Sequence, residues 1–251
     1  MSCIPLSLGA VRSFEYEVAF VEGTAVLAGS VPMAVVPSDL SDALCLFSID
    51  ISSLVPQVER LMTEPLPGGN LPATVYVQGC GKSGVAAMAA IRRLDRTHRA
   101  PRGLPPVKIL ASDASPEVVA GDAVQRYADA SAVADASDCL STLDLLGAAG
   151  LGGGADVVLA CTTAPGCETS AVLATRPRGV AVFFSMSTSF GRAALASDIA
   201  GKDVSVRVGA GLADGMDAAM FGLLRDDAAL RAHFELQAEG LAVLLGKGAS
   251  G

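Results

Sequence analysis

The chain has 251 residues, of which 51% are hydrophobic and only 4% aromatic, and it carries a formal net charge of -8. This acidic balance argues against a general nucleic-acid or anionic-membrane binder, because both need a basic face. Mean hydropathy is high at +0.48, but prolines and glycines interrupt the longest charge-free segments, 23–38 and 65–81, so we expect no membrane-spanning helix. The length fits one large domain or one and a half.

The beginning of the sequence has neither a basic region nor an apolar core of the kind that signal peptides carry. Six cysteines are scattered without a C-x-x-C pair, which is typical of reduced thiols rather than a disulfide framework. We therefore expect a cytoplasmic protein.

Residues 1–70 are the more acidic part, with a net charge of -6. Short apolar and β-branched runs, separated by glycine and proline, predict strands at Phe14–Val21, Thr24–Leu27 and Met33–Val36. A weakly helical stretch follows over Ile49–Met62, and we expect Pro56 to interrupt it. The segment Glu64–Asn70, rich in proline and glycine, predicts a linker.

Beyond the linker, apolar runs alternate with helix-like segments. The predicted strands are Thr74–Val77, Val107–Ala111, Ala130–Ala134, Asp156–Cys161, Gly179–Ser185 and Val204–Val208. Continuous apolar strands alternating with helices, the first of them at Val85–Arg99, indicate a parallel sheet covered on both faces. We predict an α/β fold, a doubly wound, six-stranded Rossmann sheet over 70–213, with one or two amphipathic helices over Met216–Leu245.

The strongest local motif is G-x-G-x-x-G, with glycines at Gly79, Gly81 and Gly84. A predicted strand leads into it and a helix leads out, which is the setting of a dinucleotide-binding turn. A purely structural glycine turn is the alternative. Lys82 makes the segment look like a phosphate-binding P-loop, but that motif needs glycine where Tyr76 stands.

Asp113 follows the second predicted strand, 29 residues beyond Gly84. An acid at this point can accept hydrogen bonds from both ribose hydroxyls and repel a 2′-phosphate, which favours NAD over NADP. A simple turn or helix cap is the alternative. Five arginines nearby predict a solvated helix face, with a 2′-phosphate site as the other interpretation: Arg92, Arg93, Arg96, Arg99 and Arg102.

Hydroxyl-rich segments follow the fourth and fifth predicted strands, at Cys161–Gly166 and Ser185–Phe190. Ligands bind beyond the carboxyl ends of strands in open α/β sheets, so these segments border the expected site, although serine and threonine also cap turns. The two histidines, His98 and His233, have no ligand-like partners nearby in the sequence. We predict no metal site and no Ser-His-Asp triad.

The segment Gly179–Phe190, followed by Ala193–Leu195, Gly201–Val204 and Gly209–Gly211, resembles the L-erythro-3,5-diaminohexanoate dehydrogenases of the medium-chain dehydrogenase superfamily. The glycine-rich segment 75–93 and the stretch from Cys161 to Ala174 are also similar to this family. The resemblance extends over most of the chain and is strongest over 155–215.

The resemblance implies an NAD(P)-dependent oxidative deamination of a diamino acid in lysine fermentation. It assigns the pyrophosphate to Gly79, Gly81, Lys82, Ser83 and Gly84, and the ribose to Asp113. It places Thr162, Thr163, Ser185 and Met186 beside the nicotinamide. Glu168 and Lys202 are its candidates for holding the substrate.

The resemblance also implies a domain organisation. Residues 1–69 correspond to part of a β-rich, GroES-like catalytic domain that begins before this chain does, and 214–251 are expected to pack back on it. A second polypeptide that completes the catalytic domain, and a homodimer, are the expected partners. Two alternatives stay open: a zinc-independent medium-chain reductase of the quinone or enone type, which predicts NADPH, and a non-catalytic dinucleotide-binding subunit.

Overall fold

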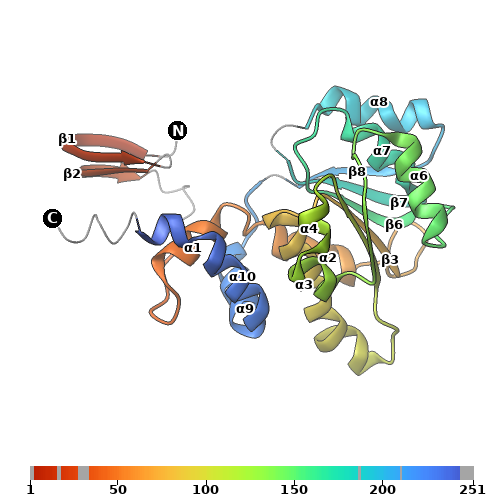
Figure 1. Cartoon of the computed structure of the whole chain (residues 1–251), viewed down its shortest axis with the longest axis horizontal. Coiled ribbons are helices and arrows are strands. Elements are labelled where there is room, and N and C mark those ends of the chain that lie inside the picture. Colours follow the sequence, from red (N-terminus) through yellow and green to blue (C-terminus); the bar gives the residue numbers. More distant parts are fainter. Residues whose placement is uncertain (1–2, 16–17, 28–33, 186–187, 210, 244–251) are drawn as a thin grey trace. The chain divides into compact units, whose positions relative to one another are not determined.

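A computed structural model describes residues 3–15, 18–27, 34–185, 188–209 and 211–243 (Figure 1). The chain divides into two compact units. One comprises 1–50 together with 232–251, and the other comprises 51–231. Each unit is described by itself.

The larger unit contains one sheet of six parallel strands in the order β5-β4-β3-β6-β7-β8. The strands are β3 (Thr74–Gln78), β4 (Lys108–Asp113), β5 (Ala130–Val133), β6 (Ala155–Ala160), β7 (Thr175–Phe183) and β8 (Ser205–Val208). The order reverses between β3 and β6, as in a doubly wound nucleotide-binding fold. The predicted six-stranded Rossmann sheet is confirmed.

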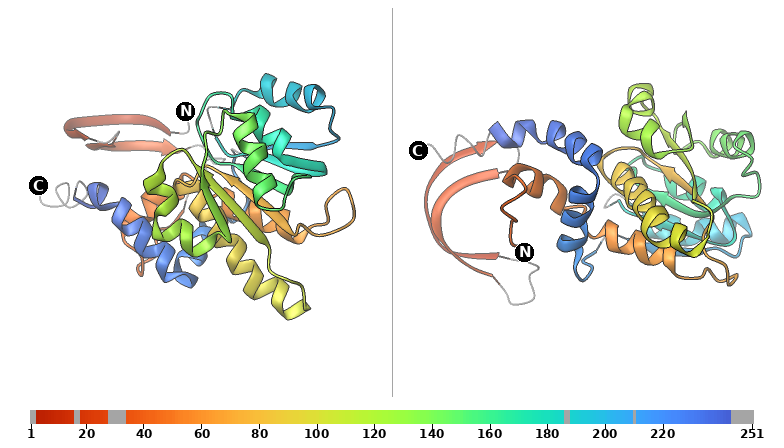
Figure 2. Two further views of the ribbon diagram at one scale, coloured as in Figure 1. Left: turned by 45° about the vertical axis from the view of Figure 1, so that its right-hand side comes forward. Right: turned by 90° about the horizontal axis from the view of Figure 1, so that it is seen from below.

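Helices cover both faces of this sheet (Figures 1 and 2). They are α2 (Leu54–Thr63), α3 (Lys82–Leu94), α4 (Pro116–Ala120), α5 (Asp122–Tyr127), α6 (Cys139–Ala148), α7 (Cys167–Ala174), α8 (Phe190–Ala200) and α9 (Met216–Asp226). α3 contacts α2, α5 and α9, whereas α7 contacts α6 and α8. The apolar side chains of α6, α7 and α8 pack with Tyr76 and Val158 in one buried cluster.

The predicted helix Val85–Arg99 begins earlier than expected, at Lys82, and continues through a π-helical turn, η1 (Asp95–Arg99), and a 3-10 turn, η2 (Ala100–Arg102). Gly103 ends it in the left-handed conformation with φ 67°. The interruption expected at Pro56 is wrong. Pro56 is the third residue of α2, in the first turn, where the missing N–H removes no intrahelical hydrogen bond.

The smaller unit contains an antiparallel pair, β1 (Cys3–Glu15) and β2 (Val18–Leu27), and the helix α1 (Asp42–Ile49). α10 (Ala228–Gln237) follows α9 in the chain, and Phe234 meets Phe47 edge to face with ring centroids 5.4 Å apart. The continuous strand predicted over Phe14–Val21 is wrong, because β1 ends at Glu15 and β2 begins at Val18. Of the strand predicted at Met33–Val36, Met33 lies outside the described residues and 34–36 form no regular element.

In the part of the chain that the structure describes, no helix combines the length and the apolar character needed to cross a membrane. The three-part division predicted over 1–69, 70–213 and 214–251 stays a prediction.

Candidate functional site

The glycine-rich turn lies where β3 ends, at the point where the strand order of the sheet reverses. Gly79 has φ 94°, a conformation that disfavours residues with a Cβ. A Cβ at this position would stand 2.9 Å from the carbonyl carbon and oxygen of Cys161, which follows β6. Gly79 is therefore required both by the backbone conformation and by the close passage of the neighbouring loop.

The other two glycines of the motif have different surroundings. A Cβ on Gly84 would come within 2.0 Å of the Gly79 carbonyl oxygen, so glycine lets α3 begin against the end of β3. Gly81 precedes α3 and is exposed, and a Cβ there would meet no atom within 4 Å. Gly84 is therefore needed for internal packing, whereas Gly81 leaves space on the outside of the turn.

The first turn of α3 begins at this open side. Lys82 and Ser83 are its first two residues, and both are half-buried. Backbone N–H groups in a first helical turn lack intrahelical acceptors, and together with the helix dipole they favour an anion. Gly81 supplies no side chain that could cap these groups.

Asp113 is the last residue of β4 and connects two turns at the same edge of the sheet. One carboxylate oxygen accepts a hydrogen bond from the Cys80 N–H at 2.8 Å, and the other accepts one from the Ser115 N–H at 3.0 Å. The structure thus places Asp113 beside the glycine-rich turn, and its predicted role at the adenosine ribose stays a prediction. The alternative role, a turn cap, is consistent with the same two hydrogen bonds, because both donors are backbone N–H groups in turns.

Buried polar groups at the ends of β3 and β4 bind the backbone of the glycine-rich turn. The Tyr76 hydroxyl lies 2.7 Å from the Ser112 hydroxyl, and the Ser112 carbonyl accepts hydrogen bonds from Gly79 N–H at 2.8 Å and from the Cys80 thiol at 3.3 Å. Burial, and secondly the negative charge of Asp113, raise the pKa of the Cys80 thiol to about 12. Cys80 is thus a neutral hydrogen-bond donor here.

The loops after β6 and β7 begin at the same edge of the sheet. In the first loop, Thr162 accepts a hydrogen bond from the Ala164 N–H through its hydroxyl at 3.1 Å, while Thr163 is exposed. In the second, Ser185 is buried and its carbonyl accepts hydrogen bonds from the N–H and hydroxyl of Thr188. Met186 lies outside the described residues.

Glu168, in the first turn of α7, is only 2% exposed. One of its carboxylate oxygens accepts a hydrogen bond from the Ser189 N–H at 2.7 Å, and the other lies 3.9 Å from Arg192 Nη1. This second oxygen is buried and has no hydrogen-bond partner among the residues described. The structure thus brings Glu168 to the two loops, but in a buried position.

Lys202 lies elsewhere. Its ammonium group donates hydrogen bonds to the Leu173 carbonyl at 2.5 Å and to the Thr175 carbonyl at 3.1 Å, at the C-terminal end of α7 and the beginning of β7. This is the opposite edge of the sheet from Gly79. The structure does not bring Lys202 together with the other predicted site residues.

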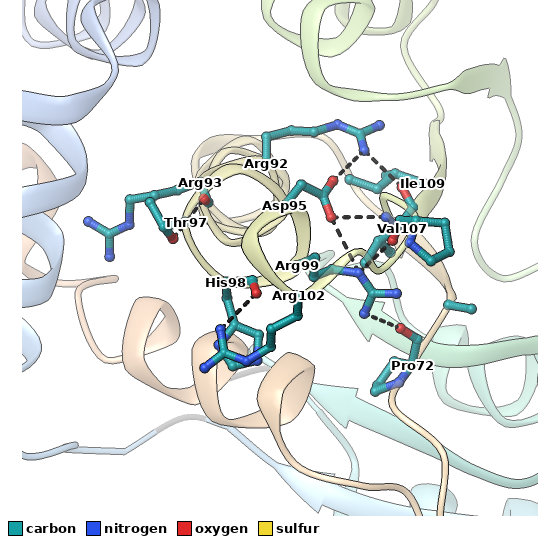
Figure 3. Close-up of polar contacts among 12 residues, drawn as sticks. Pro72, Arg92, Arg93, Asp95, Thr97, His98, Arg99, Arg102, Val107 and Ile109 are labelled. Atoms are coloured by element: carbon teal, nitrogen blue, oxygen red, sulfur yellow. Dashed lines mark hydrogen bonds and ion pairs between the residues drawn. The ribbon is translucent and has the colours of Figure 1, made fainter.

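The arginine run also lies at that opposite edge, at and beyond the C-terminal end of α3, and Figure 3 shows its polar contacts. Arg92 contacts Asp95 and Asp129 and donates to the Val107 carbonyl just before β4, while Arg99 is 3% exposed and donates to the Pro72 carbonyl just before β3. The prediction of a solvated face is wrong for these two side chains, because they hold the loops that lead into the strands. The arginines lie where β4 begins, whereas Asp113 lies where β4 ends, and the strand separates these two points by about 17 Å. The alternative of a 2′-phosphate site at the arginine run is therefore excluded for a ribose bound at Asp113.

Two polar side chains escaped the sequence reasoning. Gln78, fully buried at the end of β3, donates to the Ser170 hydroxyl at 2.9 Å, and Ser170 in turn donates to the Ala136 carbonyl. An amide directly before the first motif glycine, in an otherwise apolar strand, is the signal that could have revealed it. Arg192 carries no such signal, because nothing in its local sequence indicates that it faces Glu168.

Within the described ranges, no group of three or more His, Cys, Asp or Glu side chains is placed to hold a metal ion.

No known protein-family profile matches the chain. The resemblance predicted from the sequence is confirmed. The chain is 28% identical over 239 residues to L-erythro-3,5-diaminohexanoate dehydrogenase of Fusobacterium nucleatum, covering 93% of this chain and 64% of that enzyme. It is also 28% identical over 238 residues to the enzyme of the same name from Acetoanaerobium sticklandii, covering 94% and 65%. The chain therefore spans just under two thirds of the length of these relatives.

Solved structures share the fold. L-idonate 5-dehydrogenase of Escherichia coli has a TM-score of 0.53 at 17% identity, covering 74% of this chain and 47% of that one. A short-chain alcohol dehydrogenase of E. coli CFT073, complexed with NADH, has a TM-score of 0.55 at 16% identity, covering 82% and 54%. A structure from Sinorhizobium meliloti, bound to NADP, has a TM-score of 0.52 at 14% identity, covering 75% and 50%. At these identities the likeness concerns the fold alone.

Proposed function

We propose that this chain is the dinucleotide-binding part of an NAD(P)-dependent dehydrogenase. The observation that carries the proposal is the difference between Gly81 and Gly84 within one turn. Gly84 has internal atoms where its Cβ would stand, but Gly81 faces open space at the N-terminus of α3. Of these two glycines, packing explains the absence of a side chain only at Gly84. At Gly81, the close approach of a ligand phosphate to the backbone explains it.

The described residues fit a nicotinamide dinucleotide. The pyrophosphate would lie against Gly79, Gly81 and Gly84 and the first turn of α3, with Lys82 and Ser83 beside it. Asp113 would take the adenosine ribose. Each of its oxygens accepts one backbone hydrogen bond and keeps acceptor capacity for a hydroxyl. Its negative charge next to the ribose disfavours a 2′-phosphate, so NAD is the cofactor we propose and NADP the alternative.

The nicotinamide end would lie between the loops after β6 and β7. Thr162, Thr163 and Ser185 contribute from these loops, and Met186 is added from the sequence alone. When bound, the nicotinamide would supply the two-electron redox chemistry, and the residues of these loops would orient its ring. The described part of the chain places no residue that we assign to the acid–base steps.

The similarity to two diaminohexanoate dehydrogenases supports a small amino acid as substrate, with oxidative deamination of a diamino acid in lysine fermentation as the proposed reaction. We propose a cytoplasmic protein that works as a homodimer. A second polypeptide that completes the catalytic domain also belongs to the proposal. One competing function is a non-catalytic dinucleotide-binding subunit.

Cofactor binding is tested by titrating the chain with NADH and NADPH in a calorimeter and by following the emission of the reduced nicotinamide. We expect saturable binding, tighter for NADH, and much weaker binding by the variant Gly81→Ala. If neither nucleotide binds, the proposed function is wrong.

Turnover separates the enzyme from its competitors. With NAD and L-erythro-3,5-diaminohexanoate, the proposal predicts NADH formation together with ammonia release, either by the chain alone or together with the proposed second polypeptide. Oxidation of NADPH by a quinone or an enone instead would support the reductase alternative. Tight NADH binding without turnover of either kind would identify a binding subunit.

A further inference from the structure

The carboxylate of Glu168 joins two loops that leave neighbouring strands of the sheet. Glu168 belongs to the first turn of α7, directly after the loop that follows β6. Its hydrogen-bond donor, the Ser189 N–H, belongs to the residue that caps α8, at the end of the loop that follows β7. Among the residues of these two loops that the structure describes, no backbone hydrogen bond joins the loops beyond Phe184, whose N–H donates to the Ala160 carbonyl.

The surroundings stabilise a buried carboxylate. Glu168 lies in the first turn of α7, and its partner Ser189 is the N-cap of α8, so the positive ends of two helix dipoles converge on one negative charge. The Arg192 guanidinium, also in the first turn of α8, adds a positive charge 3.9 Å away. Burial without such compensation would cost several kcal/mol.

The contact with Arg192 is nevertheless incomplete. The distance of 3.9 Å is too long for a hydrogen bond, and the Glu168 oxygen that faces Arg192 has no other partner among the described residues. Arg192 is 53% exposed and its guanidinium passes over Gly166, where a Cβ would come within 3.5 Å of it. A small movement of α8 towards α7 would complete the pair, and the two loops would then move together.

Both loops border the proposed nicotinamide position, and the loop after β6 also passes against Gly79 at Cys161. The Asp113 carboxylate, by contrast, is bound by the N–H groups of Cys80 and Ser115, which belong to neither loop. Resting on the proposed function, we infer that Glu168 is a positioning residue: by holding the start of α8 against the start of α7, it fixes the loops that bind the nicotinamide half of the dinucleotide. The buried position of Glu168, 2% exposed, separates this role from direct contact with substrate.

The experiment compares two ligands. NADH carries the nicotinamide, and ADP-ribose carries the adenosine, both phosphates and the second ribose but no nicotinamide ring. In Glu168→Ala the link to Ser189 is lost, and we expect NADH to bind about tenfold more weakly while ADP-ribose changes by less than about twofold. Glu168→Gln keeps an oxygen that can accept from Ser189 N–H but loses the charge that faces Arg192, so it should restore part of the NADH affinity and leave an intermediate loss.

A matched control is Glu239→Gln, which makes the same chemical change at an exposed position and should alter neither affinity. Circular dichroism melting separates loss of fold from loss of positioning. If Glu168→Ala does not fold, the Gln variant alone decides, with an intermediate loss confined to NADH expected. Equal losses for both ligands, or no loss for either, would overturn the role of Glu168 while leaving the proposed function intact. If the unaltered chain binds neither ligand, both proposals are wrong.

Discussion

Replacing Gly84 with alanine tests whether the third motif glycine serves packing rather than ligand binding. The new Cβ would stand 2.0 Å from the Gly79 carbonyl oxygen and 3.0 Å from its carbonyl carbon. Both are backbone atoms next to β3, so no side-chain rotation can relieve the contact. The beginning of α3 must move away from the strand by about 1 Å, because Cβ–O contacts in folded proteins rarely fall below ~3 Å.

Overpacking of this kind costs typically about 1–3 kcal/mol, and we take the upper end because the contact is with backbone. The higher helix propensity of alanine offsets this cost by about 1 kcal/mol of unfolding free energy, because glycine is the less favourable residue in a helix. The expected net loss is therefore about 2 kcal/mol, a large part of a total stability of about 5–15 kcal/mol. For a chain of this size, that corresponds to a Tm lower by about 4–8 °C.

The assay is urea unfolding followed by circular dichroism at the helix band, with two glycine variants as controls. A Cβ on Gly147, within α6, meets nothing within 4 Å, so Gly147→Ala should stabilise the protein by about 0.5–1 kcal/mol. Gly81→Ala should leave stability within about 0.5 kcal/mol of the original while it weakens NADH binding. If Gly84→Ala proves as stable as Gly147→Ala, the packing argument for the turn is refuted.

Three further predictions concern single side chains. Asp156 accepts hydrogen bonds from the N–H groups of Ala73 and Thr74, both at 2.8 Å, so Asp156→Asn should lower stability at pH 7 by about 1.5–3 kcal/mol. Burial tends to raise the pKa of Asp156, but these hydrogen bonds and Arg176 lower it overall from the usual value of 3.8. The stabilisation by the carboxylate is therefore fully present at pH values above the ordinary pKa, and it is lost as the pH falls through the lowered pKa. The Tm difference between the two proteins should thus shrink only below about pH 4, and a difference that already shrinks near pH 6 would contradict the argument. Cys80, with its pKa near 12 and 3% exposure, should resist iodoacetamide at pH 8 in the native chain but not in urea, as read by peptide mass mapping; rapid native labelling would show that the turn opens. Asp113→Asn should narrow the preference for NADH over NADPH in calorimetry, and an unchanged ratio would remove Asp113 from the ribose site.

The parts of the fold that the sequence predicted well are those where burial is uniform. β6 is buried at every residue, and its apolar run located it to within one residue at each end. β7 was predicted from Gly179, but it begins at Thr175, because its first half is partly exposed and includes Arg178 at a positive φ of 64°. The boundary between β1 and β2 was missed, and one continuous strand predicted over Phe14–Val21, for a different reason: the sequence between Glu15 and Val18 carries no glycine, proline or asparagine.

Charged residues were harder to place than strands, because a charge can serve a helix end as well as a site. In a parallel α/β sheet, each helix that follows a strand begins at the edge where ligands bind and ends at the opposite edge. Glu168 and Lys202 contact the two ends of one helix, α7: the carboxylate lies in its first turn, and the ammonium group meets its last carbonyls. Each complements the helix dipole, so the dipole does not distinguish the two residues. The two residues differ in which end of α7 they contact: Glu168 lies at the N-terminal end, which is at the ligand edge of the sheet, and Lys202 contacts the C-terminal end, at the opposite edge. The same rule applies to α3, where Lys82 begins the helix beside the glycine-rich turn, while Arg92 and Arg99 lie at or beyond its end and hold the loops leading into the strands. For this chain, the position of a charge along its helix separates candidate site residues from structural ones better than its residue type does.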